Sequence, residues 1–249
     1  MQAIFEFGHA LLCGLYPRRC CACLDEIDEG RRWGLCPLCE AALLPTGAGR
    51  CPVCGRPRPG LPLRFVGEPC RTCAAAPPPF DRAIAPYQHG GPLALALSRF
   101  KYDDKPAAAK PLGQLLARAA RGFLRSGALQ LPDLVLPVPL HKKRLRQRGY
   151  NQSALLAREV CRTLNLPFSL DALARIRDTP SQVRQGSRTA RSRNLEGAIT
   201  VMRPETLRAR TVLLIDDVFT SGATAAACSK ALRTAKPASV HVLTLTRKD

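Results

Sequence analysis

The fold is decided by the stretch Val212-Leu213-Leu214-Ile215-Asp216-Asp217-Val218-Phe219-Thr220-Ser221-Gly222-Ala223-Thr224. Its four leading aliphatic residues predict a strand buried on both faces, which is typical of a parallel sheet covered by helices. Asp216 and Asp217 then fall at the carboxyl end of this strand, where open α/β sheets bind ligands. Two carboxylates at this position can accept hydrogen bonds from a vicinal diol.

The turn after the acids favours a phosphate group. It offers hydroxyls, backbone N–H groups and one glycine at the start of a predicted helix, in the residues Thr220, Ser221, Gly222, Ala223 and Thr224. The alternative is that Asp216 and Asp217 only end a strand and cap a helix. It explains neither the presence of two adjacent acids nor the glycine. A diol site followed by a phosphate site predicts binding of ribose 5-phosphate.

All thirteen positions resemble the signature of the type I phosphoribosyltransferases, which bind phosphoribosyl pyrophosphate (PRPP). The resemblance implies that Asp216 and Asp217 hold the ribose 2′- and 3′-hydroxyls and that Thr220 to Thr224 hold the 5′-phosphate. It also implies that Mg²⁺ enters with PRPP, and that the protein mainly positions the sugar and neutralises charge while pyrophosphate leaves C1.

Eight of the twelve cysteines form four Cys-x-x-Cys pairs near the N-terminus: Cys20 and Cys23, Cys36 and Cys39, Cys51 and Cys54, Cys70 and Cys73. This spacing is typical of zinc ribbons, in which four thiolates hold a structural ion in a tetrahedron. We expect two Zn²⁺ ions, with neighbouring pairs combining, although the spacing alone also allows an interleaved arrangement.

Two other chemistries compete with zinc at these cysteines. A disulfide scaffold would need an export signal, whereas the N-terminus has acidic Glu6 and no basic leader. A redox Cys-x-x-Cys would sit once at a helix start, not four times among prolines and glycines. We therefore expect a cytoplasmic, soluble protein with structural metal sites, without a transmembrane segment and with a short amphipathic helix over residues 1–16.

The three prolines at 77–79 form a stiff spacer. We place a zinc-ribbon module at residues 1–79 and a phosphoribosyltransferase-like domain at 80–249. After the spacer, strands and helices alternate, which predicts an α/β fold with a mainly parallel sheet. The further strands are expected at 83–87, 134–140, 173–177, 198–202 and 239–246, and the further helices at 93–100, 112–123 and 151–164.

Two basic segments accompany the signature. Residues 141–152, expected as a loop, place five cations within seven residues, among them Lys142, Arg144 and Arg148. The segment 179–194 carries further arginines, including Arg191 and Arg193, without an apolar period. The resemblance implies that the first segment binds pyrophosphate and that the second is a flexible lid, whereas a solvated basic surface is the ordinary alternative.

The net charge of +19 lies almost wholly in the transferase-like region, because residues 1–80 hold nine Lys and Arg against seven Asp and Glu. PRPP accounts for a local cluster of cations but not for such an excess. Binding of nucleic acid would account for it, although no aromatic-rich stacking motif is present. Histidine gives little guidance, since no motif surrounds His9, His89 or His241.

Over nearly its whole length the chain resembles the ComF family of competence proteins. The resemblance rests on the order of Leu15–Cys20, the cysteine pairs, Phe100-Lys101-Tyr102, Arg148-Gly149-Tyr150-Asn151-Gln152, Thr179, Gln182, Arg191, Asn194, Gly197-Ala198 and the signature. Ile199 and Ser187 depart from the family pattern. The resemblance implies a role in DNA uptake, which leaves three hypotheses: a PRPP- and magnesium-dependent transferase of unknown acceptor, a factor that binds single-stranded DNA without catalysis, and a protein that senses PRPP. Oligomeric state stays open.

Overall fold

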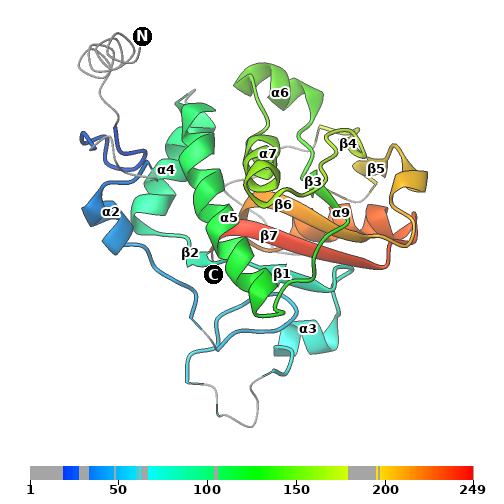
Figure 1. Ribbon diagram of the computed structural model, residues 1–249. Helices are drawn as coiled ribbons and strands as arrows, with labels where there is room; N and C mark the ends of the chain where they lie inside the picture. The colour runs from blue at the N-terminus through cyan, green and yellow to red at the C-terminus, as the bar shows by residue number, and fades with distance from the viewer. Residues whose placement is uncertain are drawn as a thin grey trace.

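The computed structural model describes residues 19–27, 34–47, 49–60, 62, 67–103, 106–178, 195 and 197–248. The helix expected at 1–16 and the lid expected at 179–194, with Arg191 and Arg193, lie outside the described residues. Figure 1 shows a central sheet with helices on its two faces and the cysteine-rich segments along one side.

The central sheet is parallel, as predicted. Its order is β1 (Arg82–Ile84), β7 (Ser239–Arg247), β6 (Thr211–Phe219) and β3 (Leu134–Pro137), and β2 (Tyr87–Gln88) extends the β1 edge by pairing with β7. The signature strand β6 therefore lies in the middle of the sheet, between β7 and β3. Its position buries both of its faces.

Alternate residues of β6 face two different layers of the core. Leu213 and Ile215 belong to a buried cluster with α4 (Gly91–Tyr102), α5 (Ala109–Arg125) and α7 (Gln152–Leu164). Val212 and Leu214 belong to a second cluster with α9 (Ala223–Arg233). In Figure 1, α5 and α7 lie in front of the sheet and α9 lies behind it. The α/β fold class predicted from the sequence is confirmed.

Two strand predictions need correction. The strand expected at 83–87 is divided into β1 and β2, because Pro86 has no N–H with which to continue a ladder. The strands β4 (Leu173–Arg175) and β5 (Ile199–Val201) form a separate antiparallel pair and do not join the parallel sheet. Alternation along the chain indicated the strands but not their partners.

The basic segment expected as a loop is a helix, α6 (Lys142–Arg148). His141 caps its start by accepting a hydrogen bond from the Lys143 N–H at 3.3 Å, and left-handed Gly149 ends it. Lys, Arg, Gln and Leu are good helix formers, so the run of charge concealed a helix. The remaining helices are α2 (Pro37–Ala41), α3 (Arg71–Ala75) and the 3₁₀ turns Pro106–Ala108 and Pro204–Thr206.

The cysteine-rich segments are held against the edge of the sheet. Ala83 N–H donates to the Val53 carbonyl at 2.7 Å, and Thr46 Oγ1 donates to the Ala85 carbonyl at 2.8 Å. These bonds connect the chain before residue 79 with the first strand after it. The division into modules at 79/80 stays a prediction.

None of the helices in the described segments combines the length and the hydropathy of a membrane span.

Candidate functional site

The acid pair lies on β6 at the carboxyl edge of the sheet. Ser153 Oγ, from the first turn of α7, donates to Asp216 Oδ1 at 2.7 Å, and the Asp217 N–H donates to the same oxygen at 3.0 Å. Asp217 is buried, with 6% of its surface exposed, and its Oδ2 lies 2.5 Å from Lys101 Nζ. Lys101 comes from the last turn of α4.

Asp216 differs from an ordinary surface acid in its preference for charge. Burial first, and then the charge of Asp217, raise the pKa of Asp216 to about 7, although Ser153 and Lys101 act in the opposite direction. Burial also opposes the charge of Lys101, but Asp217 outweighs it and raises the pKa of that ammonium. The site therefore holds two adjacent acids with a single lysine set against them.

The turn after the acids has the geometry expected of an anion site. Gly222 has φ +79°, and a Cβ at this position would lie 2.7 Å from the Phe219 ring, so a side chain here is excluded twice. Gly222 is the N-cap of α9 and gives it no side-chain cap. The first N–H groups of a helix point outward and favour anions, and Thr220 to Thr224 surround this end.

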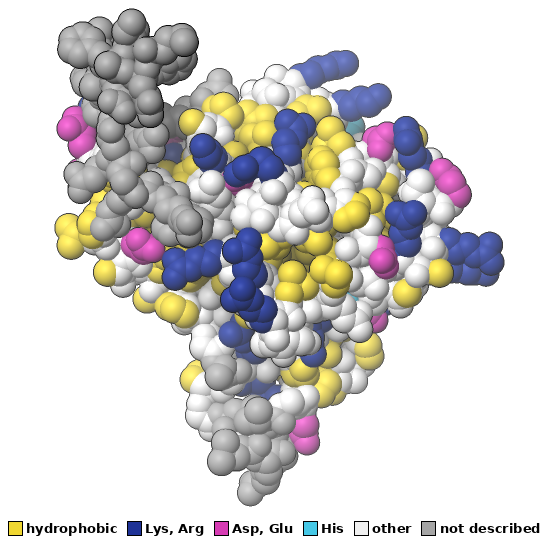
Figure 2. Space-filling view, in the orientation of Figure 1, with side chains coloured by type: hydrophobic (Ala, Val, Ile, Leu, Met, Phe, Trp, Pro, Cys, Tyr) yellow, Lys and Arg dark blue, Asp and Glu magenta, His cyan; other side chains and the backbone are white. Residues whose placement is uncertain are grey.

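The basic helix α6 begins at the same edge of the sheet. Strand β3 pairs in parallel with β6, so that Pro137 lies opposite Ile215, and Asn151 Nδ2 donates to the Val138 carbonyl at 3.0 Å. Both ends of α6 are therefore anchored beside the acids. Figure 2 shows Lys and Arg side chains projecting over α6 at the top of the molecule and others spread over α5.

The three cations expected to bind pyrophosphate are in different situations. Lys142 is exposed, whereas Arg144 Nε lies 3.8 Å from Asp178. Arg148 Nη1 donates to Gln152 Oε1 at 2.8 Å, and its guanidinium lies 5.6 Å from the centre of the Tyr102 ring. The structure thus brings the three cations to one edge, with Arg148 fixed by neighbours within the chain.

Three further residues at this edge escaped the sequence analysis. Lys101 and Ser153 bind the two acids directly, and their only signal was their place in or beside the family's sequence anchors. His89 follows β2, and its Nδ1 lies 3.0 Å from Thr246 Oγ1. Burial and then the charges of Lys101 and Lys248 lower the pKa of His89, whereas the charge of Asp217 acts in the opposite direction.

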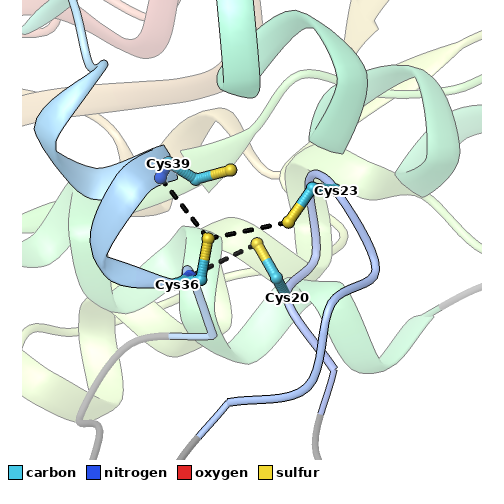
Figure 3. A group of neighbouring side chains, drawn as sticks. All are labelled: Cys20, Cys23, Cys36 and Cys39. Atoms are coloured by element: carbon cyan, nitrogen blue, oxygen red, sulfur yellow. Dashed lines mark hydrogen bonds between the residues drawn. The ribbon is translucent and has the colours of Figure 1, made fainter.

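The cysteines assemble into two groups, in the sequential pairing that we expected. The first cysteine group is Cys20, Cys23, Cys36 and Cys39, and the second cysteine group is Cys51, Cys54, Cys70 and Cys73. Within each group the Sγ atoms all lie within 4.8 Å of one another. Figure 3 shows the first group converging, with Cys20 and Cys23 from a turn and Cys36 and Cys39 from the start of α2.

The surroundings of the cysteines suit thiolates held by a cation. Backbone hydrogen bonds outweigh burial and lower the pKa of Cys20 to about 7, and Cys70 in the second group also reaches about 7 because hydrogen bonds outweigh burial. Burial and the neighbouring cysteines raise the pKa of Cys39 and Cys73. A cation is what stabilises four thiolates together. Each group fits a tetrahedral zinc ion.

Comparison with known proteins defines the class first. A family model described as the phosphoribosyl transferase domain matches residues 151–249, which include α7, β6, the turn and α9. The chain therefore contains a phosphoribosyltransferase-type α/β domain, beside two four-cysteine groups that could hold zinc. The structure of a PRPP amidotransferase from B. subtilis aligns with 55% of this chain and 26% of its own at 21% identity and a TM-score of 0.36, a likeness too distant to carry a conclusion.

Curated relatives match almost the whole chain. The DNA utilization protein YhgH of Escherichia coli O157:H7 is 33% identical over 231 residues, covering 93% of this chain and 97% of that protein. Competence protein F of Haemophilus influenzae is 31% identical over 86% of this chain and 90% of its own. Competence protein ComFC of Bacillus subtilis is 25% identical over 94% of this chain and 97% of its own. The chain belongs to the ComF family.

Proposed function

We propose that this protein binds PRPP together with Mg²⁺ at the carboxyl edge of β6 and acts as a phosphoribosyltransferase in the utilisation of DNA. The observation that carries the proposal is the juxtaposition of the acid pair with the glycine turn at the start of α9. Asp216 and Asp217 take the ribose hydroxyls, and Thr220, Ser221, Gly222, Ala223 and Thr224 take the 5′-phosphate. The link to DNA rests on the names of the relatives.

The basic helix α6 supplies the third part of the site. Lys142, Arg144 and Arg148 belong to α6, which follows β3, the strand that neighbours β6. A pyrophosphate on C1 of the sugar would need neutralising at this edge of the sheet. Arg191 and Arg193 would add charge from the lid segment. In the transfer, the bond from C1 to the pyrophosphate oxygen breaks as a nucleophile attacks C1, and the leaving group carries the electron pair to these cations and to Mg²⁺.

Calorimetric titration with PRPP and Mg²⁺ tests the assignment. The wild-type protein should bind, and the double variant Asp216→Asn with Asp217→Asn should bind at least about tenfold more weakly because both diol acceptors lose their charge. Asp171→Asn is a matched control, since Asp171 is an exposed acid that pairs with Arg203 at 2.7 Å. Absence of binding by the wild type, or equal binding by the double variant, would contradict the proposal.

The raised pKa of Asp216 adds a second readout. Because Asp216 is protonated below about pH 7, affinity for PRPP should fall as the pH drops through that value. Fold stability should run the other way: an acid with a raised pKa in the folded state contributes stability at low pH and loses it as the pH rises. Asp216→Asn should remove the contribution of this acid and so reduce both slopes, as thermal unfolding and titration from pH 5.5 to 8.5 would show.

A second function, binding of single-stranded DNA without catalysis, is favoured by the net charge of +19 and by the names of the relatives. Binding through phosphate contacts would weaken steeply with salt. Incubating the protein with PRPP, Mg²⁺ and a panel of bases, nucleosides and oligonucleotides, followed by mass spectrometry, separates the two functions. A phosphoribosylated product supports the enzyme. Salt-dependent binding of an oligonucleotide without a product supports the DNA-binding factor. In that case any PRPP that binds would be sensed rather than consumed.

We also propose that the two cysteine groups hold structural zinc. The ion in each would be bound by two cysteines of a turn and two at the start of a short helix. Metal analysis of the purified protein should find about two zinc ions per chain.

A further inference from the structure

The last turn of α4 touches the candidate site on two sides. Tyr150 OH and Gln152 Nε2 donate to the carbonyl of Phe100, at 2.7 and 3.4 Å, and the rings of Phe100 and Tyr150 lie 5.7 Å apart. These bonds satisfy a carbonyl that the helix end leaves free. They hold α4 firmly against the junction between α6 and α7.

The next two residues of α4 reach the two halves of the proposed pocket. Lys101 contacts Asp217 of the diol site, and Tyr102 lies under the guanidinium of Arg148, which belongs to the proposed pyrophosphate helix. The tripeptide therefore bridges the place of the sugar hydroxyls and the place of the leaving group.

The ion pair between Lys101 and Asp217 occupies an oxygen that a sugar hydroxyl would need. The Nζ to Oδ2 distance is 2.5 Å, and the side chains of Lys101 and Asp217 are 26% and 9% exposed. A lysine carries a compact charge on a flexible stem, so it can leave one partner for another within a few ångströms. An ammonium displaced from Asp217 would need a new anion, because a buried charge without a partner is costly.

We propose that Lys101 is a substrate-binding residue of this site, which balances Asp217 in the protein alone and transfers its ammonium to the pyrophosphate on C1 when the ribose diol binds Asp217. The inference rests on the proposed function. On this inference Lys101 is the residue that distinguishes PRPP, which has a pyrophosphate on C1, from ribose 5-phosphate, which has none.

Affinities for two ligands test the inference. Calorimetry with PRPP and with ribose 5-phosphate, both with Mg²⁺, should show Lys101→Met binding PRPP about 10- to 100-fold more weakly than the wild type while its affinity for ribose 5-phosphate changes less than about threefold. Lys101→Arg should recover part of the affinity for PRPP. Lys110→Met, which removes an exposed lysine from α5, should match the wild type for both ligands.

The outcomes separate this inference from the proposed function. Failure of the wild type to bind PRPP overturns the proposed function and this inference with it. If the wild type binds PRPP, equal weakening for both ligands shows that Lys101 only orders Asp217, and unchanged affinities show that it lies outside the pocket. Either result overturns the inference and leaves the proposed function standing.

A second test uses the wild-type protein alone, so it does not depend on whether a variant folds. Reductive methylation of lysines, followed by mass spectrometry of the peptide that contains Lys101, reports how free its ammonium is. Ribose 5-phosphate should displace Lys101 from Asp217 without replacing its partner, so methylation should rise about threefold or more, whereas PRPP should lower it below that of the protein alone. Equal methylation with the two ligands overturns the inference.

Discussion

The first cysteine group and the second share one local design. In each, a turn presents two cysteines and is closed by a small antiparallel bridge, between Arg19 and Glu26 in the first and between Arg50 and Pro57 in the second. In each, the other two cysteines lie at the start of a five-residue helix, α2 or α3. In each, one turn sulfur accepts a hydrogen bond from the first cysteine N–H of the helix: Cys36 to Cys20 at 3.3 Å and Cys70 to Cys51 at 3.2 Å.

Their surroundings differ. Cys20 and Cys36 belong to the main buried cluster, together with Leu97 and Phe100 of α4 and with residues of α5, α7 and the sheet. The second group forms a small cluster of its own. Among the described residues, Val53 and Cys54 are the partly buried apolar residues that pack on its buried cysteines, and Val53 also packs against the buried cluster beside α9. It is joined to the sheet edge by a few hydrogen bonds, one of them from Arg247 Nη1 to the Cys54 carbonyl at 2.5 Å.

Two groups with the same four ligands can therefore stabilise different parts of the protein. A metal in the first group would complete the core that supports α4, α5 and the sheet, whereas a metal in the second would order a surface lobe. The following four experiments test this difference, in order of decreasing effect.

The largest effect is expected from Cys20→Ser compared with Cys51→Ser. The two sulfurs are matched in burial, at 0% and 1% exposure. Because Cys20 lies in the main core, its loss should lower the free energy of unfolding by about 3 kcal/mol or more, and the loss of Cys51 by about half as much. Denaturant unfolding followed by circular dichroism measures both, and equal losses would show that the groups are equivalent.

Removal of metal by a chelator should occur in two steps. The second group should release its ion first, because fewer buried neighbours hold it closed. Amides of β6 and α5 should remain protected from hydrogen exchange through the first step and lose protection in the second. Cys51→Ser should lack the first step. Release of both ions in one step, with simultaneous loss of protection, would contradict the comparison.

A smaller effect is expected where the second group meets the sheet. Gly55 has φ +71°, and a Cβ there would lie 2.6 Å from the Ala83 carbonyl oxygen. Gly60 has the same φ, and no atom of the described residues lies within 4 Å of its Cβ position. Gly55→Ala should therefore destabilise the protein by about 1 to 2 kcal/mol more than Gly60→Ala, in thermal or denaturant unfolding. A negligible difference would mean that this contact does not tie the group to β1.

The smallest effect is expected from Arg247→Met. Arg247 is buried, lies 4.8 Å from the centre of the Phe219 ring and binds Cys54, so it connects the second group with the ring that packs under Gly222. Its loss should weaken PRPP binding about threefold through the less firmly held ring. Arg71→Met removes an exposed arginine of α3 as a control, and equal affinities in both variants would deny any connection.

Local sequence was sufficient for the features built from neighbouring residues. The signature strand and turn lie within thirteen residues, and each cysteine pair within four, so spacing alone indicated their chemistry. For the four-cysteine grouping the sequence favoured sequential pairing but also allowed an interleaved one, and the structure shows the sequential pairing. The parallel sheet followed from alternation and from strands apolar on both faces.

The remaining features depend on contacts between distant segments. Ser153 reaches Asp216 across 63 positions, and Lys101 reaches Asp217 from the end of another helix, so neither contact leaves a local pattern. The antiparallel pairing of β4 with β5 likewise joins strands that lie far apart in the sequence, so it leaves no local pattern. Helix α6 did leave local signals, because His141 can cap its start and Gly149 can end it. The run of charged residues between them led to the prediction of a loop instead.

The location of the first cysteine group has a consequence for the making of the protein. Its sulfurs form part of the interior on which α4 rests, and α4 carries Lys101. If the first group holds zinc as proposed, a newly synthesised chain that finds none would lack a stable interior. Nutritional scarcity of the metal would then be expected to lower the amount of intact protein.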